Sequence, residues 1–151
     1  MKITKEDLKV RFDEYNRLYF GGKLGKCTFS ARKIGSFGFY FFKTAKSGKL
    51  ESRITLTTNV NWTEDSLRDV LVHEMIHHYV VTIDGCKWVD GWSWYGLFGH
   101  GKHFRRQVRR IERENGLKIY IHGCPGLYHK HEKISTTTWG KFVRFIDYNL
   151  T

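Results

Sequence analysis

The sequence predicts a single α+β domain in which a small antiparallel β-sheet packs against a central helix and flanking helices. Its 151 residues suffice for one hydrophobic core, and 40% of them are hydrophobic and 16% aromatic, as in packed globular proteins. Runs with helical periodicity and runs rich in β-branched and aromatic residues follow each other in the order α–β–β–β–α–α–β–β. One proline and no low-complexity tract leave no evident linker, so we expect one domain over residues 1–151.

The first expected helix runs from Thr4 to about Phe20. Thr4 is a suitable N-cap, and the acidic side chains of Glu6 and Asp7 suit the positive end of the helix dipole. Apolar and aromatic residues recur at helical spacing, at Leu8, Phe12, Tyr15 and Tyr19. The glycines of "GGKLG", residues 21–25, end this helix.

The middle of the chain predicts the sheet and the central helix. Three runs rich in β-forming residues lie at about 27–34, 37–43 and 53–58, and they indicate antiparallel strands. A second helix is expected from a cap at Thr63 to about Val81. Its apolar residues are typical of a buried helix: Leu67, Val70, Leu71 and Tyr79.

The last third begins with a connection rich in glycine and tryptophan at residues 84–99. Its aromatic side chains either cover the core or form a lid or substrate groove. The second alternative is suggested by the glycines that interleave with them, as in a mobile loop. A third helix is expected at about 101–115, where Gly116 can serve as C-terminal cap. The segments 117–122 and 141–148 have the composition of strands.

Composition excludes several classes of protein. The 26 Lys and Arg residues against 15 Asp and Glu give a net charge of +11, which favours polyanions without sequence specificity. Three widely spaced cysteines do not indicate a disulfide framework, and the first residues lack the apolar run of a signal peptide. No stretch approaches the roughly 18–20 apolar residues of a membrane span. We therefore expect a cytoplasmic protein without a membrane partner.

The segment "LVHEMIHHYV", residues 71–80, carries the pattern H-E-x-x-H. His73 and His77 lie one helical turn apart on one face, so both imidazoles can reach a single Zn²⁺ ion. Glu74 follows the first histidine and can contact a bound water, whose pKa zinc lowers from 15.7 to roughly 7. A chance match is disfavoured because the other positions of the helix are apolar, where unpartnered polar side chains are costly to bury. The adjacent His78 points elsewhere and is expected to be structural.

Two histidines leave a catalytic zinc site short of a third protein ligand. The segment "GHGKHF", residues 99–104, offers His100 and His103 near the start of the third helix. Glu112 and Glu114 are further candidates, since some zinc proteases use a glutamate from the next helix. These residues by themselves leave the choice open.

The combination of "HEMIH" and "GHGKHF" resembles the SprT-like family of zinc metalloproteases, which includes DNA-dependent proteases. Three other stretches are similar to parts of that family, namely "YNRLYFGGKL" (15–24), "GSFGFY" (35–40) and "ITLT" (54–57). The resemblance covers about residues 10–110. It implies a minimal zincin-like metalloprotease fold.

By position, the resemblance implies that His73, His77 and His100 bind zinc and that Glu74 is the catalytic base. His103 stays as the alternative third ligand. The implied substrates are proteins on DNA or crosslinked to it.

The chain departs from the family pattern in two places. The interval between His77 and His100 is long and holds the tryptophan-rich connection. The C-terminal region has only one cysteine, Cys124, so the four-cysteine zinc ribbon of many family members cannot form. A second metal site is conceivable at His122, Cys124, His129 and His131, but their spacing matches no strong pattern and a degenerate hairpin is expected instead.

The third expected helix is strongly basic. Its cations are Lys102, Arg105, Arg106, Arg109, Arg110 and Arg113. Phe104, Val108 and Ile111 recur at spacings that should face the core, so the cations occupy the exposed arc. Solvated helix faces usually mix charges of both signs, whereas this arc is almost wholly positive. It predicts contact with DNA phosphates without base recognition.

The sequence therefore predicts a zinc metalloendopeptidase that acts on a protein substrate. The main alternative is a non-catalytic nucleic-acid-binding domain with a structural zinc. A structural site would normally be closed by a fourth protein ligand and would not need Glu74, which favours the enzyme. A zinc hydrolase acting on other bonds is a third possibility, because the ligand set does not specify the bond cleaved.

Overall fold

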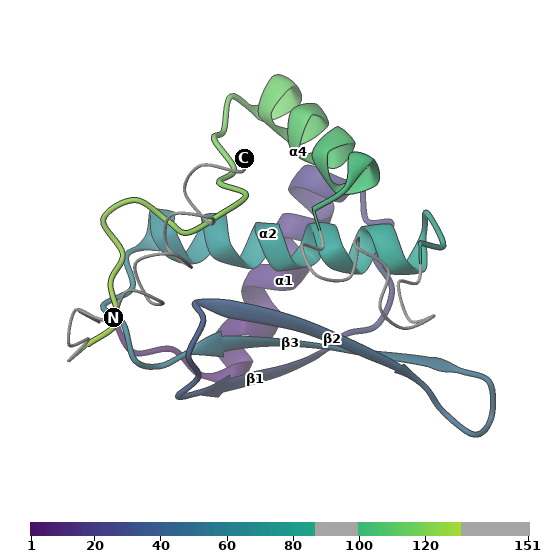
Figure 1. Ribbon diagram of the computed structural model, residues 1–151, viewed down its shortest axis with the longest axis horizontal. Helices are drawn as coiled ribbons and strands as arrows, with labels where there is room; N and C mark the ends of the chain where they lie inside the picture. Colours follow the sequence, from purple (N-terminus) through teal and green to yellow (C-terminus); the bar gives the residue numbers. More distant parts are fainter. Residues whose placement is uncertain (87–99, 131–151) are drawn as a thin grey trace, which may run out of the picture.

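The computed structural model describes residues 1–86 and 100–130 and confirms the α+β class. Helices α1 (Lys5–Phe20), α2 (Glu64–Thr82) and α4 (Lys102–Asn115) accompany a three-stranded sheet. Figure 1 shows α2 running across the molecule between the sheet and α4. The predicted strand at 141–148 and most of the predicted connection at 84–99 lie outside the described residues.

The sheet is mixed, so the prediction of a wholly antiparallel sheet was wrong. Its strands are β1 (Thr28–Arg32), β2 (Gly38–Thr44) and β3 (Leu50–Thr57), in the spatial order β1-β3-β2. β2 and β3 are antiparallel, as the sequence predicts for the sheet, but β1 pairs with β3 in parallel. Because β3 occupies the centre, β1 and β2 lie on opposite sides of it. Composition reveals strands but not which strand takes the middle of a sheet.

α1 begins as predicted. Thr4 accepts a hydrogen bond from the backbone N–H of Asp7, and the Asp7 side chain accepts one from the backbone N–H of Thr4, which forms a capping box. The helix ends at Gly21, whose left-handed backbone has φ 59°. Phe12 packs edge-on against Phe29 of β1, with ring centroids 5.1 Å apart, and so attaches α1 to the sheet.

α2 is the central buried helix. Thr63 and Ser66 form a capping box at its first turn. Twelve of its residues are buried, including Leu67, Leu71 and Ile76, because the helix contacts the sheet, α1 and α4. A polar side chain at one of these buried positions, such as Glu74 or His77, is therefore desolvated.

α4 buries one face and exposes the other. Phe104, Val108 and Ile111 are buried as predicted, together with Gln107. Gly116 ends the helix in a left-handed conformation with φ 65°.

The strand predicted at 117–122 is absent. The segment joins no ladder, and the pairing found for residues 116–130 is one isolated bridge between Val60 and His129. Ile119 is buried, and the carbonyl oxygen of Tyr120 lies within hydrogen-bonding distance of His73 rather than pairing with a strand. The strand-like composition of 117–122 therefore reflects apolar residues that pack against the core, not membership of the sheet. Among the described helices, none is long and apolar enough to cross a membrane.

Candidate metal centre

α2 presents three neighbouring polar side chains toward one site. His73 and His77 are one turn apart, with ring centroids separated by 5.1 Å, and Glu74 lies next to the first of them. Glu74 and His77 are buried, although polar side chains of these types are seldom buried without a partner or a function. The apolar sequence around them holds α2 in the core and so fixes their position.

His100 lies beside this pair. It directly precedes Gly101, the N-cap of α4. The Nε2 atoms of His100 and His73 are 3.1 Å apart, and the potential ligand atoms of all three histidines lie within 4.8 Å of one another. Imidazole nitrogens that bind tetrahedral zinc at 2.0–2.1 Å are separated by about 3.3 Å. The structure therefore brings together His73, His77 and His100, and small side-chain rotations suffice to match the spacing of a zinc site.

Hydrogen bonding orients the first histidine. Nδ1 of His73 is 3.0 Å from the carbonyl oxygen of Tyr120, which accepts a hydrogen bond when this nitrogen carries the proton. The lone pair of His73 Nε2 then points at His100. A partner on the remote nitrogen is the usual arrangement for a metal-binding histidine.

His100 provides the test of fit. Its Nδ1 is buried without a hydrogen-bond partner, while its Nε2 meets the Nε2 of His73. If Nε2 carries the proton, a buried acceptor at Nδ1 is left unsatisfied. If Nδ1 carries it, a buried donor is left unsatisfied and two lone pairs face each other. A cation between the rings would bind both of the lone pairs that face each other. The three histidines therefore fit a metal such as zinc.

Phe104 of α4 forms an apolar wall behind the three histidines. Its ring centroid lies 4.9 Å from that of His73, 4.5 Å from that of His77 and 4.7 Å from that of His100. The sequence identified Phe104 only as a core residue. Its ring also shields the histidines from water, which no local sequence pattern could indicate.

Burial keeps the three imidazoles neutral. Desolvation lowers the pKa of His73 from 6.5 to about 4 and that of His100 to about 3. The pKa of His77 is also lowered well below 6.5, first by desolvation and then by the neighbouring histidines. Neutral imidazole is the form that can bind a metal ion, so at neutral pH the three histidines are in the protonation state that a metal site requires.

Glu74 lies at the side of the site that faces β2. Burial raises the pKa of its carboxyl from 4.5 to about 8. Gly38, the first residue of β2, makes room for it, because a Cβ atom at this position would lie 2.7 Å from Oε1 of Glu74. No sequence pattern connects Gly38 with the site, since the contact is between segments distant along the chain.

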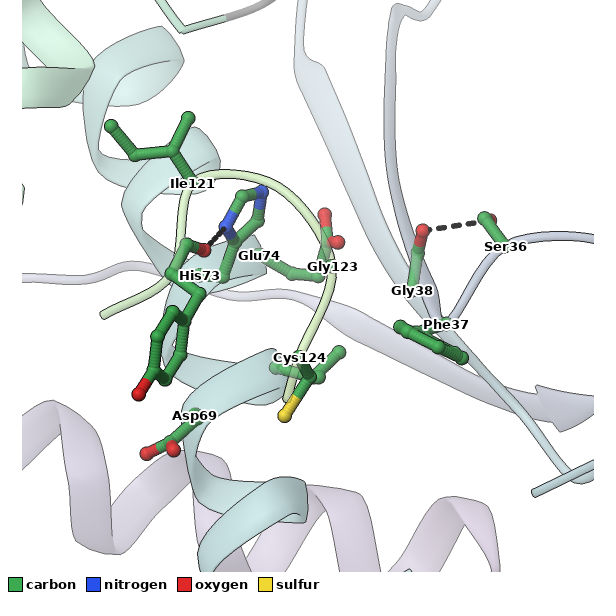
Figure 2. Close-up of a pocket in the computed structure, with 11 residues that line it drawn as sticks. Ser36, Phe37, Gly38, Asp69, His73, Glu74, Ile121, Gly123 and Cys124 are labelled. Atoms are coloured by element: carbon green, nitrogen blue, oxygen red, sulfur yellow. Dashed lines mark hydrogen bonds between the residues drawn. The ribbon is translucent and has the colours of Figure 1, made fainter. Parts of the chain in front are cut away.

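A pocket of about 150 Å³ opens beside His73 and Glu74. Figure 2 shows the segment around Ile121, Gly123 and Cys124 on one side of it and the start of β2 on the other. Glu74 is one of the residues that line this pocket. The expected strand at 117–122 thus becomes a wall of this pocket.

The other candidates for the third ligand lie elsewhere. His103 is 3.6 Å from the Asp84 carboxylate. Glu112 pairs with Lys118 and Glu114 pairs with Arg110. None of these three belongs to the group of closely spaced ligand atoms found in residues 1–86 and 100–130.

The conceivable second metal site is not formed by the residues that the structure describes. His122 lies beside His100, with ring centroids 5.1 Å apart, whereas His129 stacks on Phe37. These residues and Cys124 do not gather into a separate group within the described ranges, and His131 lies outside them. His78 bonds to Tyr40 and to the carbonyl of Gly25, away from the metal centre, consistent with a structural role.

The predicted nucleic-acid-binding cations of α4 divide into two groups. Lys102, Arg106, Arg109 and Arg113 are exposed. Arg105 and Arg110 are half-buried: Arg105 donates to the His100 carbonyl, and Arg110 donates to the Tyr19 carbonyl and to Glu114. The first group is available to phosphates, while Arg105 supports the segment that carries His100.

The fold, the His73, Glu74 and His77 side chains of α2 and the nearby His100 together are typical of compact metalloprotease-like domains. Residues 8–123 match the SprT-like family, and the chain belongs to that family, which confirms the resemblance seen in the sequence. The chain is also similar to the DNA-dependent metalloprotease dvc-1 of Caenorhabditis elegans, with 26% identity over 133 residues. This alignment covers 83% of the chain and 34% of the relative, so the chain spans about a third of that protein's length.

Proposed function

We propose that the protein is a zinc metallopeptidase in which His73, His77 and His100 hold the metal. The observation that carries this proposal is the convergence of three neutral imidazoles beside a buried glutamate at an accessible pocket. Membership of the SprT-like family and the similarity to a relative named as a metalloprotease support it. When bound, zinc would polarise a peptide carbonyl and make a water more acidic.

Glu74 is proposed as the general base. Its carboxylate lines the pocket and can take the proton of the attacking water, then pass it to the amine that leaves. Burial brings its pKa toward neutral, and a nearby cation favours the ionised form that accepts the proton. The Tyr120 carbonyl keeps His73 oriented while this transfer occurs.

Proteins on DNA are the proposed substrates. The relative's name describes a DNA-dependent enzyme, and this chain carries a net charge of +11. The exposed cations of α4 would contact phosphates and keep the pocket near DNA-bound protein. A location wherever DNA is accessible, cytoplasm or nucleus, follows from this proposal.

A Glu74→Gln variant tests the enzyme against the alternative of a non-catalytic DNA-binding domain with structural zinc. The proposal predicts that the variant retains zinc but loses cleavage of casein by about 100-fold or more, with and without added DNA. Glu14→Gln, an exposed carboxylate on α1, is the matched control and should cleave like the wild type. Unchanged cleavage by Glu74→Gln, or no cleavage by zinc-loaded wild type under any of these conditions, would contradict the proposal.

A further inference from the structure

The outer face of the sheet carries two exposed aromatic rings. Side chains alternate along β2, so Tyr40 and Phe42 face the helices while Phe39 and Phe41 face away from them. Phe39 is 53% exposed and Phe41 is 47% exposed, although large apolar side chains usually gain by burial. Because the described helices contact the opposite face, these rings are available to a partner.

Cations surround Phe41. A groove of about 320 Å³ on this face is lined by Phe41 and by the cations Lys26, Lys43, Lys49 and Arg53. Glu51 is the single carboxylate among its lining residues, and it pairs with Lys43 at 3.5 Å. The groove therefore attracts an anionic partner.

The strand register places aromatic and cationic groups in one row. Arg53 of β3 lies directly opposite Phe41 of β2 on one side and Thr28 of β1 on the other. Phe39 lies two residues before Phe41 on the same face, about 7 Å away along the strand. Each ring can therefore contact a separate planar group, such as a nucleobase.

From this arrangement we infer that the outer face of the sheet binds single-stranded DNA, with bases stacked on Phe39 and Phe41 and phosphates beside Lys26, Lys49 and Arg53. Rings interleaved with cations suit single strands, whose unpaired bases are free to stack. Paired bases in a duplex cannot reach such rings. The inference rests on the proposed action at DNA and assigns it a second contact surface.

This surface is separate from the basic face of α4. In Figure 1, α2 lies between the sheet and α4, so the two cationic regions are on different sides of the central helix. The α4 cations have no exposed aromatic residue among them within Lys102–Asn115, which suits phosphate contact alone. Base stacking is therefore specific to the sheet face.

The test measures binding of fluorescent oligo(dT), roughly 16 nucleotides long, to the full chain. Combined replacement of Phe39→Ala and Phe41→Ala should weaken binding roughly tenfold or more. Leu18→Ala, a similarly exposed apolar residue on α1, is the matched control and should bind normally. Thermal unfolding of each variant verifies that it is folded.

Ultraviolet crosslinking locates the contact independently of these variants. The inference predicts that oligo(dT) crosslinks to the wild type at Phe39 or Phe41, as identified by mass spectrometry of the peptides. Equal binding by the double variant and the wild type, or crosslinks confined to α4, would overturn it. Tighter binding of oligo(rU) than of oligo(dT), or a loss of duplex binding in the double variant as large as its loss of oligo(dT) binding, would overturn it as well. Because the readout is binding, its failure is distinguishable from failure of the proposed peptidase, whose readout is cleavage.

Discussion

The buried ionisable residues of the metal centre act in opposite directions on stability. Unfolded histidines take up protons below about pH 6.5, whereas His73 stays neutral down to about pH 4 in the folded chain. Glu74 behaves in the opposite way, because the folded chain keeps its proton up to about pH 8 and the unfolded chain releases it near 4.5. The histidines favour unfolding as pH falls, and Glu74 favours unfolding as pH rises.

These signs predict a maximum in the stability of the metal-free chain. From about pH 4.5 to 6.5, three histidines outweigh one glutamate, so the free energy of unfolding should rise with pH. From about pH 6.5 to 8 Glu74 is the residue of the metal centre that still titrates differently in the folded and unfolded chain, and its contribution should lower the free energy of unfolding by up to about 1.4 kcal/mol per pH unit.

Urea unfolding in the presence of a chelator measures this profile. Glu74→Gln should remove the decline above pH 6.5 and leave the rise below it. A wild-type profile that keeps rising to pH 8, or a decline that persists in the variant, would show that Glu74 does not titrate as the structure indicates.

At the scale of elements, the start of β2 limits the space around the carboxylate of Glu74, the proposed general base. A Cβ atom at position 38 would meet Glu74 Oε1 at 2.7 Å and Leu56 Cδ2 at 2.8 Å, both closer than ordinary contacts. Gly38→Ala should therefore displace Glu74, reduce cleavage about tenfold or more, and cost roughly 1–3 kcal/mol of stability.

The matched control is Gly35→Ala, where an added Cβ atom meets nothing within 4 Å. Cleavage assays and denaturant unfolding should show little change in this variant. If Gly38→Ala cleaved and unfolded like the control, β2 would not constrain the position of Glu74.

The basic face of α4 makes a second prediction at this scale. Replacing Arg106, Arg109 and Arg113 by Gln should weaken binding of duplex DNA and make the salt dependence shallower by about 0.9 for each phosphate that the protein no longer neutralises. A matched variant removes the same charge from α1 at Lys5, Lys9 and Arg17, which are also exposed. Fluorescence anisotropy at several salt concentrations compares the two, and equal weakening would indicate that only net charge matters.

For the whole molecule, local sequence patterns predicted those structural features that depend on residues close together in the chain. Short stretches predicted the caps at Thr4 and Thr63, the central helix and the three strands. They did not predict the parallel pairing of β1, because the order of strands depends on contacts distant along the chain. The segment 117–122 shows the same limit, since its strand-like composition reflects packing against the core rather than a ladder.

The candidate site likewise has residues that the sequence predicted and contacts that it did not. Spacing within α2 identifies His73, Glu74 and His77 as neighbours, and resemblance to the SprT-like family pointed to His100. Spacing alone could not choose between His100 and His103, since they are three residues apart. The close approach of Gly38 and the carbonyl of Tyr120 depend on the backbone path, which no side-chain pattern specifies.

Zinc content by elemental analysis tests the central claim most directly. The comparison uses wild type, His100→Ala and His103→Ala, each purified without chelator and dialysed against metal-free buffer. We predict one zinc per wild-type chain, retention in His103→Ala, and loss in His100→Ala, because His100, and not His103, lies with His73 and His77. Loss in His103→Ala with retention in His100→Ala, or a wild type that binds no zinc even when it is supplied, would contradict the account.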